Sequence, residues 1–143
     1  KNTSPTSSVL SLGTSIVGEG NDFLVYAFSP VEGYSAFGNY TGNNSNNGPF
    51  VYTGFRPRWI MFKRFDATSS WRIHDTGRED YNPHDSLLFP NESSAETTNS
   101  VYDVDIVSNG FKVRNTNSNF NADGGTYIYA CFSEHPFKTA RAR

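Results

Sequence analysis

Two His-Asp pairs come closest to a general acid–base arrangement in this sequence. They are His74-Asp75 and His84-Asp85. Neighbouring residues of a strand point to opposite faces of a sheet, so neither pair is placed to act on one substrate as a dyad. Neither pair belongs to a nucleophile elbow or to a zinc-binding motif. These histidines therefore predict no catalytic centre.

Glu92 and Glu96 are a second candidate, because two carboxylates can hydrolyse a glycosidic bond. They lie in a polar loop rich in serine and threonine, residues 91–100, and glutamates in such loops are usually solvated. We predict that the protein is not an enzyme and that it uses no cofactor.

Metal-binding patterns are weak. The loop GNNSNNG at residues 42–48 offers amide oxygens but no carboxylate, and calcium sites normally contain Asp or Glu. Asn121 and Asp123 are explained by the turn that they form with the two following glycines. Cys131 is the only cysteine, which excludes an intrachain disulfide and a cysteine zinc cluster, and its apolar neighbours predict a buried thiol. We expect no metal site.

A glycan-binding or receptor-binding surface is the binding function that the side chains favour most. Aromatic rings stack on sugars, and Trp71, Tyr81 and His84 lie on or beside the most irregular surface segment, residues 76–85, together with Arg78. The structural alternative places Trp71 in the core and makes Tyr81 an anchor of the loop. Arg78 would then form an ion pair with Asp75 that ties the loop down.

Composition narrows the function classes further. The chain has 143 residues, a formal net charge of −2 and a sequence pI of about 5.9, which is not the footprint of a nucleic-acid-binding protein. No segment is long and apolar enough for membrane insertion. Lys138, Arg141 and Arg143 are interpreted as a solvated terminus. Aromatic residues make up 15% of the sequence, so a few large side chains can anchor one core in an otherwise polar chain.

Short apolar and aromatic runs separated by turn residues predict strands, and no run has a convincing helical period. The predicted strands cover residues 9–12, 22–28, 35–41, 50–53, 58–64, 71–74, 86–89 and 126–133. We expect residues 22–28 to be buried, and Trp71 and Ile73 to face inward with Arg72 and His74 outward. One helical turn is allowed around residues 94–97. The pattern predicts an all-β fold, an antiparallel β-sandwich of jelly-roll or concanavalin-like type with little or no helix.

The dipeptide Asn109-Gly110 predicts a two-residue type I′ hairpin turn, because both central residues of that turn need positive φ. This turn would pair Ile106 with Val113 and Asp105 with Arg114. Val104, Ile106, Phe111 and Val113 would share the core face of the hairpin.

The two ends of the chain resemble each other. FLVYAFS at residues 23–29 aligns with YIYACFS at residues 127–133, and a loop rich in glycine precedes each run. One interpretation is coincidence between two aromatic strands. The other is a tandem array, in which residues 22–34 contain the closing strand of a preceding repeat. We expect a linker or the end of a preceding unit at residues 1–21 and one β-sandwich domain at residues 22–143.

Several motifs resemble a module of bacteriophage tail and tail-fibre proteins. They are VEGYSAFGNYTGN at residues 31–43, GFRPRWIMFKR at 54–64, His74-Asp75 with Arg78, Asn91, Ala95-Glu96, SNGFK at 108–112 and GTYIYACFSEHPF at 125–137. The resemblance covers most of residues 23–143 and is most specific near the C-terminal strand.

The resemblance implies a virion structural or attachment protein, extracellular, in a tail fibre or similar appendage. Such modules have concanavalin-like sandwich character and no agreed catalytic residues. The implied partners are other virion proteins and a host-surface glycan or receptor, and the implied assembly is a homotrimer. A glycan-binding module is the alternative function, and a depolymerase of cell-surface polysaccharide ranks behind both.

Overall fold

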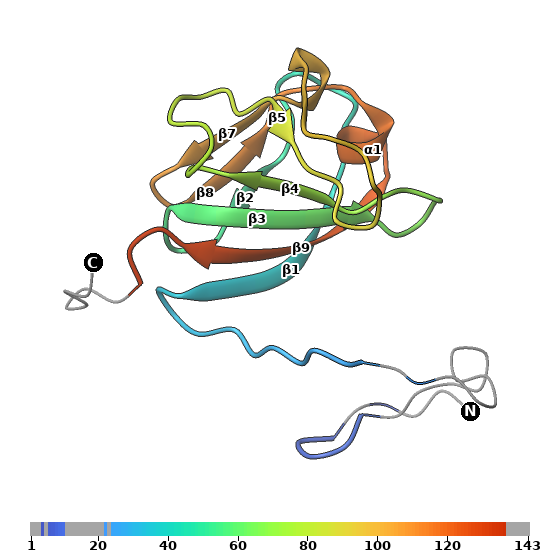
Figure 1. The fold of residues 1–143 in the computed structure, drawn as a ribbon, viewed down its shortest axis with the longest axis vertical. Helices are drawn as coiled ribbons and strands as arrows, with labels where there is room; N and C mark the ends of the chain where they lie inside the picture. The colour runs from blue at the N-terminus through green and yellow to red at the C-terminus, as the bar shows by residue number, and fades with distance from the viewer. Residues whose placement is uncertain (1–3, 5, 11–21, 23, 137–143) are drawn as a thin grey trace.

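The chain folds into two antiparallel sheets that face each other. The computed structural model describes residues 4, 6–10, 22 and 24–136. Sheet A has the order β1-β9-β3-β4 and sheet B the order β2-β8-β7 (Figure 1). The strands of sheet A are β1 (Ser35–Thr41), β9 (Thr126–Ser133), β3 (Pro57–Arg64) and β4 (Arg72–Asp75). Those of sheet B are β2 (Phe50–Tyr52), β8 (Gly110–Val113) and β7 (Val104–Val107).

The remaining elements are short. A two-stranded sheet pairs β5 (Ser86–Leu87) with β6 (Thr97–Thr98). The helical elements of the described residues are η1 (Ser100–Tyr102) and α1 (Ser118–Asn121). The predicted all-β sandwich with little helix is therefore confirmed, although the strand predicted at residues 86–89 is shorter than expected. No helix among the described residues is long and apolar enough to cross a membrane.

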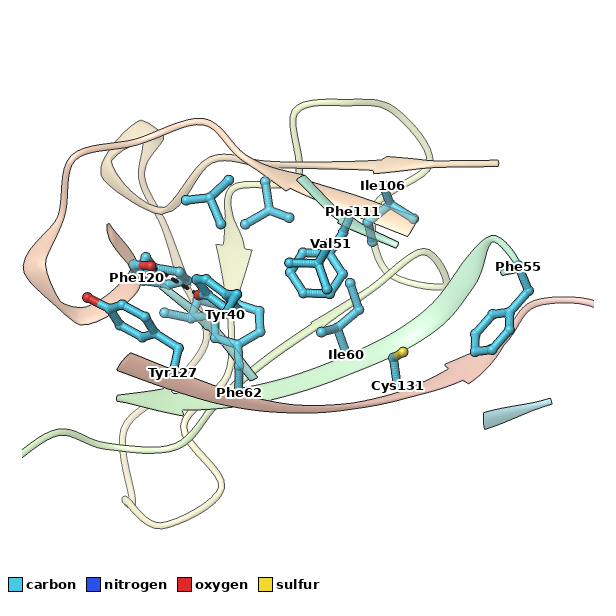
Figure 2. Close-up of a cluster of buried hydrophobic side chains, with 13 residues drawn as sticks. Tyr40, Val51, Phe55, Ile60, Phe62, Ile106, Phe111, Phe120, Tyr127 and Cys131 are labelled. Carbon is cyan, nitrogen blue, oxygen red and sulfur yellow. Dashed lines mark hydrogen bonds between the residues drawn. The ribbon is translucent and has the colours of Figure 1, made fainter. Parts of the chain in front are cut away.

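The core lies between the two sheets. Figure 2 shows Ile60, Phe62 and Tyr127 rising from sheet A toward Val51 and Phe111 of sheet B. All five side chains are buried, and the rings of Phe62 and Phe111 stack with centroids 6.4 Å apart. Because aromatic rings bury much area each, this cluster stabilises a chain that has few aliphatic residues.

The C-terminal strand β9 is the centre of sheet A. It pairs with β1 along one edge and with β3 along the other. Tyr127 and Cys131 point into the core and are fully buried, as predicted for Cys131. Phe132 points the other way, with its ring near Phe37 and Trp59. A strand with neighbours on both edges and apolar contacts on both faces has apolar residues at successive positions, which explains the aromatic run in the sequence.

The prediction for β4 is wrong by one residue. Arg72 and His74 face the core, with exposures of 5% and 0%, while Trp71 and Ile73 lie on the outer face. Arg72 is accommodated because its guanidinium donates to Ser69 Oγ and to a backbone carbonyl and lies over the Phe120 ring. The outer face of sheet A is itself apolar, so alternation of side chains did not distinguish it from the core face.

The predicted register of the hairpin is also wrong, although the four residues predicted to face the core do so. Ile106 pairs with Phe111 and Val104 with Val113, so the turn is centred on residues 108 and 109. The φ of Gly110 is not positive. Instead, a Cβ on this residue would lie 2.1 Å from the carbonyl oxygen of Val51 on β2. The glycine is therefore needed for the close approach of a third strand rather than for a turn.

Three further expectations fail. Residues 24–28 are not a buried strand, because they form no strand and are exposed. Residues 9 and 10 form no strand, and residues 11 and 12 lie outside the described residues. The helical turn expected around residues 94–97 is replaced by the start of β6, and a 3-10 turn follows at η1. Lys138, Arg141 and Arg143 lie outside the described residues.

Candidate functional site

The four residues predicted to bind a glycan or receptor do not form one surface. Trp71 precedes β4 on the outer face of sheet A, where the ammonium of Lys63 lies 5.5 Å from its ring centroid. Arg78 follows the other end of β4, and a strand of this length separates its ends by roughly 13 Å. Tyr81 is exposed at the loop surface. The structure therefore does not bring Trp71 together with Arg78 and Tyr81.

His84 is a correction, because it is fully buried rather than at the surface. Its backbone N–H and carbonyl pair with Val104, which fixes it beside sheet B. Burial lowers the pKa of His84, although Glu79, with Oε2 3.7 Å from Nδ1, opposes the shift. A buried neutral histidine is a core residue here, not a ligand contact.

Arg78 is committed to a structural contact, as the sequence predicted. Its Nε donates to Asp75 Oδ2 at 2.5 Å, and another guanidinium nitrogen donates to Glu96. Burial raises the pKa of Asp75, but the hydrogen bond and charge of Arg78 outweigh this effect and the net pKa is lowered. Glu96 is therefore an ion-pair partner, and Glu92 binds the hydroxyls of Ser70 and Ser94. The two glutamates do not converge on a common site.

The described residues contain a polar groove that the sequence analysis did not predict. It encloses about 370 Å³ and lies where η1, the start of β7 and the end of β8 approach the loop at residues 42–48. Its lining consists mainly of amide and hydroxyl side chains with one acidic and one basic residue: Asn46, Ser100, Asp103, Arg114, Asn115 and Asn117. We call this feature the polar groove.

Buried asparagines hold the walls of the polar groove in place. Asn121 is fully buried, donates to the carbonyl oxygens of Ser45 and Asn115, and accepts from the N–H of Asn43. Asn115 is also buried and donates to the carbonyl oxygen of Asp103 at 3.0 Å. Because these amides satisfy backbone groups from three loops at once, the loops are fixed to each other. The polar groove is therefore preorganised.

Asp103 is the unusual group of the polar groove. Its Oδ1 is buried and has no hydrogen-bond partner among the residues that the structure describes. Burial raises the pKa of Asp103, and the nearby carboxylates of Asp85 and Asp105 add to the shift. Arg114 opposes the shift, but its guanidinium is paired with Asp105 at 3.3 Å. A buried carboxylate oxygen without a donor is an unfavourable arrangement.

The polar groove escaped prediction because its residues look like turn formers. Asn, Asp, Ser and Thr favour turns, and the loops at residues 42–48 and 114–117 were interpreted only in that way. The signal that was present is the density of asparagines in two loops far apart in sequence. No sequence pattern showed that the loops meet.

The chemistry of the polar groove is that of a neutral hydrogen-bonding surface with one charged group of each sign. Among the described residues, no group of three or more His, Cys, Asp and Glu side chains could hold a metal ion. Asp103 is the carboxylate among the groove residues named above, and the histidines of residues 24–136 lie elsewhere or in the core. The groove instead offers hydrogen-bond donors and acceptors, both neutral and charged, and its net charge is small. The fold is a β-sandwich with a polar groove between its loops.

Comparison with known families identifies the group to which the chain belongs. Residues 1–136 match the family described as a domain of unknown function, DUF7483, and the chain is a member of that family. Searches of the curated proteins and of the solved structures found no match.

Proposed function

We propose that this domain is a non-catalytic attachment module of a virion appendage, such as a phage tail fibre, and that its polar groove binds a host-surface glycan. The location in a virion rests on the sequence resemblance to tail and tail-fibre modules. The proposal for the groove rests on one observation, the gathering of amide, hydroxyl and charged side chains around Asp103 on walls that buried asparagines hold in place.

The chemistry of the polar groove suits a saccharide better than an anion. Sugars present hydroxyl groups that both donate and accept hydrogen bonds, and the groove offers the amides of Asn46 and Asn117 beside the charges of Asp103 and Arg114. Asp103 and Arg114 cancel in charge, so a phosphate or polyanion gains little. Preorganised walls also reduce the entropy that binding costs.

A glycan array followed by titration of the best hit tests the groove. We expect Asp103→Ala to weaken binding by at least tenfold, because a hydrogen bond to a charged group contributes about 1.5–3 kcal/mol. Asp80→Ala is the matched control. It removes an exposed carboxylate that is not part of the groove lining, and binding should change little. The groove proposal fails if no glycan binds, or if both variants bind equally.

Two further measurements address the rest of the proposal. Cryo-electron microscopy of the parent particle should place the domain in a tail or fibre, and its symmetry would test the expected trimer. Incubation with the bound polysaccharide should release no reducing ends. Turnover that is lost with a single Asp or Glu substitution would contradict the non-catalytic assignment.

A further inference from the structure

An apolar run ahead of β1 lies outside the sandwich. Figure 1 shows the chain before β1 running away from the two sheets. Within this run, Leu24, Tyr26 and Phe28 are 77%, 74% and 65% exposed. Residues 24–28 belong to no strand. Large apolar side chains in succession are rarely left in water, so the exposed part of this run is a candidate contact surface.

The echo of β9 in this run indicates what the partner is. In β9, Tyr127 and Cys131 face the core, while Ala130 and Phe132 face outward. The alignment of residues 23–29 with 127–133 makes Val25 and Ala27 the counterparts of inward residues. Leu24, Tyr26 and Phe28 are then the counterparts of outward residues.

The contacts of the run follow the same alternation. Tyr26 and Phe28, the two outward counterparts, line an apolar depression of about 490 Å³ on the outer face of sheet A with Phe37, Trp59, Met61 and Phe132. The Phe28 ring lies 5.7 Å from Phe37 and 6.0 Å from Phe132. Val25 and Ala27 are not part of this lining and both are exposed, although Ala27 also borders a second depression with residues 6–10. Neither side chain is part of the core of this sandwich.

A strand like β9 needs two neighbours. In this domain β9 pairs with β1 on one edge and β3 on the other, so the edges of β1 and β3 that a second such strand would need are already paired. Among the described strands, no second pair equivalent to β1 and β3 is present for residues 23–29. A second copy of the fold would supply such a pair. Within one copy β9 comes last, and the run stands directly before β1 of this copy, which is the order expected for consecutive copies in one chain.

We propose that residues 23–29 are the closing strand of a preceding copy of this fold in the same polypeptide. The outer face of sheet A is the surface on which the two copies meet, through Tyr26 and Phe28. The connection between the copies is short, and the backbone pairing of Val31 with Ser35 fixes its geometry. Consecutive copies would therefore hold a defined orientation.

Exchange of the two strands tests the first half of this proposal in the existing chain. The variant carries Tyr127→Phe, Ile128→Leu, Tyr129→Val, Ala130→Tyr and Cys131→Ala, which gives β9 the sequence of residues 23–29. We expect this variant to unfold cooperatively on heating, at a lowered Tm. A second variant keeps Tyr127 and carries the other four substitutions, so that the effect of losing the Tyr127 hydroxyl can be separated from theirs. The control places the same five residues one position out of register and should not fold. Failure of both in-register variants would overturn the proposal.

A two-copy chain tests the partner. A second copy of residues 31–122 is placed directly before Glu19, so that residues 23–29 can close it. We expect a protease-resistant fragment with both copies and at least 100-fold slower amide exchange at Val25 and Ala27. Val25→Asp should unfold the upstream copy, whereas Leu24→Asp should leave it folded. The proposal is wrong if the upstream copy is digested, or if the original chain forms a dimer that Val25→Asp dissociates.

Discussion

Asn121 and Asn43 are joined by a hydrogen bond of 2.7 Å between the backbone N–H of Asn43 and the side-chain oxygen of Asn121. The same amide donates to Ser45 and Asn115 at 2.8 Å each. One buried side chain thus replaces the strand partners that these loop backbones lack. The position of the loop at residues 42–48, and with it one wall of the polar groove, depends on this residue.

Asn121→Ala should therefore lower both stability and groove order. Three hydrogen bonds to backbone groups disappear, one of them buried and two partly buried. At about 1–3 kcal/mol for each buried group left unpaired, and less for a partly buried one, we expect a loss of several kcal/mol. Chemical denaturation measures the loss, and faster exchange of the Asn43 amide should accompany it. Asn119→Ala is the control, because that side chain is partly exposed and accepts a hydrogen bond from Ser69 Oγ. An equal effect of the two substitutions would contradict the role of Asn121.

Tyr127→Phe should destabilise the fold more than Tyr129→Phe. The Tyr127 hydroxyl donates to the carbonyl oxygen of Ser118 and accepts from the N–H of Ala122, both at 2.7 Å. Loss of both bonds should cost about 1–3 kcal/mol, since the Ala122 N–H is left without its partner. Tyr129 packs edge-on against Phe111 and shows no hydrogen bond among the described residues. Thermal unfolding of the pair compares them, and similar Tm values would refute the prediction.

His74 should make the protein acid-sensitive. Burial, with the nearby His84, lowers its pKa from 6.5 to about 3. The unfolded chain takes up a proton below pH 6.5 and the folded chain only below about pH 3. Protonation of His74 therefore does not reduce the free energy of unfolding above pH 6.5. As the pH decreases from 6.5 to 3, the free energy of unfolding falls by about 1.4 kcal/mol per pH unit.

His74→Leu should flatten this pH dependence. Neither ring nitrogen of His74 has a hydrogen-bond partner among the described residues, and the ring packs against Phe62 and Phe120. An apolar replacement of similar volume should thus be neutral or stabilising at pH 7. Denaturation curves between pH 3 and pH 7 provide the measurement, with the exposed His135→Gln as control. An unchanged acid slope in His74→Leu would show that other groups govern it.

Gly110→Ala should disrupt sheet B although alanine suits the backbone of a strand. Its Cβ would lie 2.1 Å from the carbonyl oxygen of Val51, which cannot move without breaking the pairing of β2 with β8. We expect a loss of several kcal/mol, as for an overpacked core site. Gly124→Ala tests the opposite case, since a Cβ there meets no atom within 4 Å and only the positive φ opposes it. A milder effect at Gly110 than at Gly124 would be inconsistent with this explanation.

Local features of the sequence were sufficient for several results. The aromatic run at residues 126–133 predicted β9 with its bounds, and the two glycines before it predicted the turn in which Gly124 has positive φ. The ion pair of Asp75 with Arg78 was also predicted, because the two residues lie only three apart. The core face of the hairpin was right for the same reason, since alternation along a strand is a local property.

The features that failed depend on what lies across the sheet. Alternation along the sequence could not show which residues of β4 face the core, because Trp71 and Ile73 lie on an outer face that is itself apolar. The hairpin register was decided by β2, whose backbone approaches Gly110 so closely that the glycine cannot be interpreted from the turn alone.

The sequence by itself determined that this is an all-β domain with an aromatic C-terminal strand and an echo of that strand near its start. Both facts are carried by residue types and spacings within a few positions. Only the tertiary structure decided which residues line the polar groove, because Asp103, Arg114 and Asn46 come from loops that meet through buried amides. It also decided that residues 24–28 lie outside the sandwich, since every neighbour that a strand like β9 requires is already occupied.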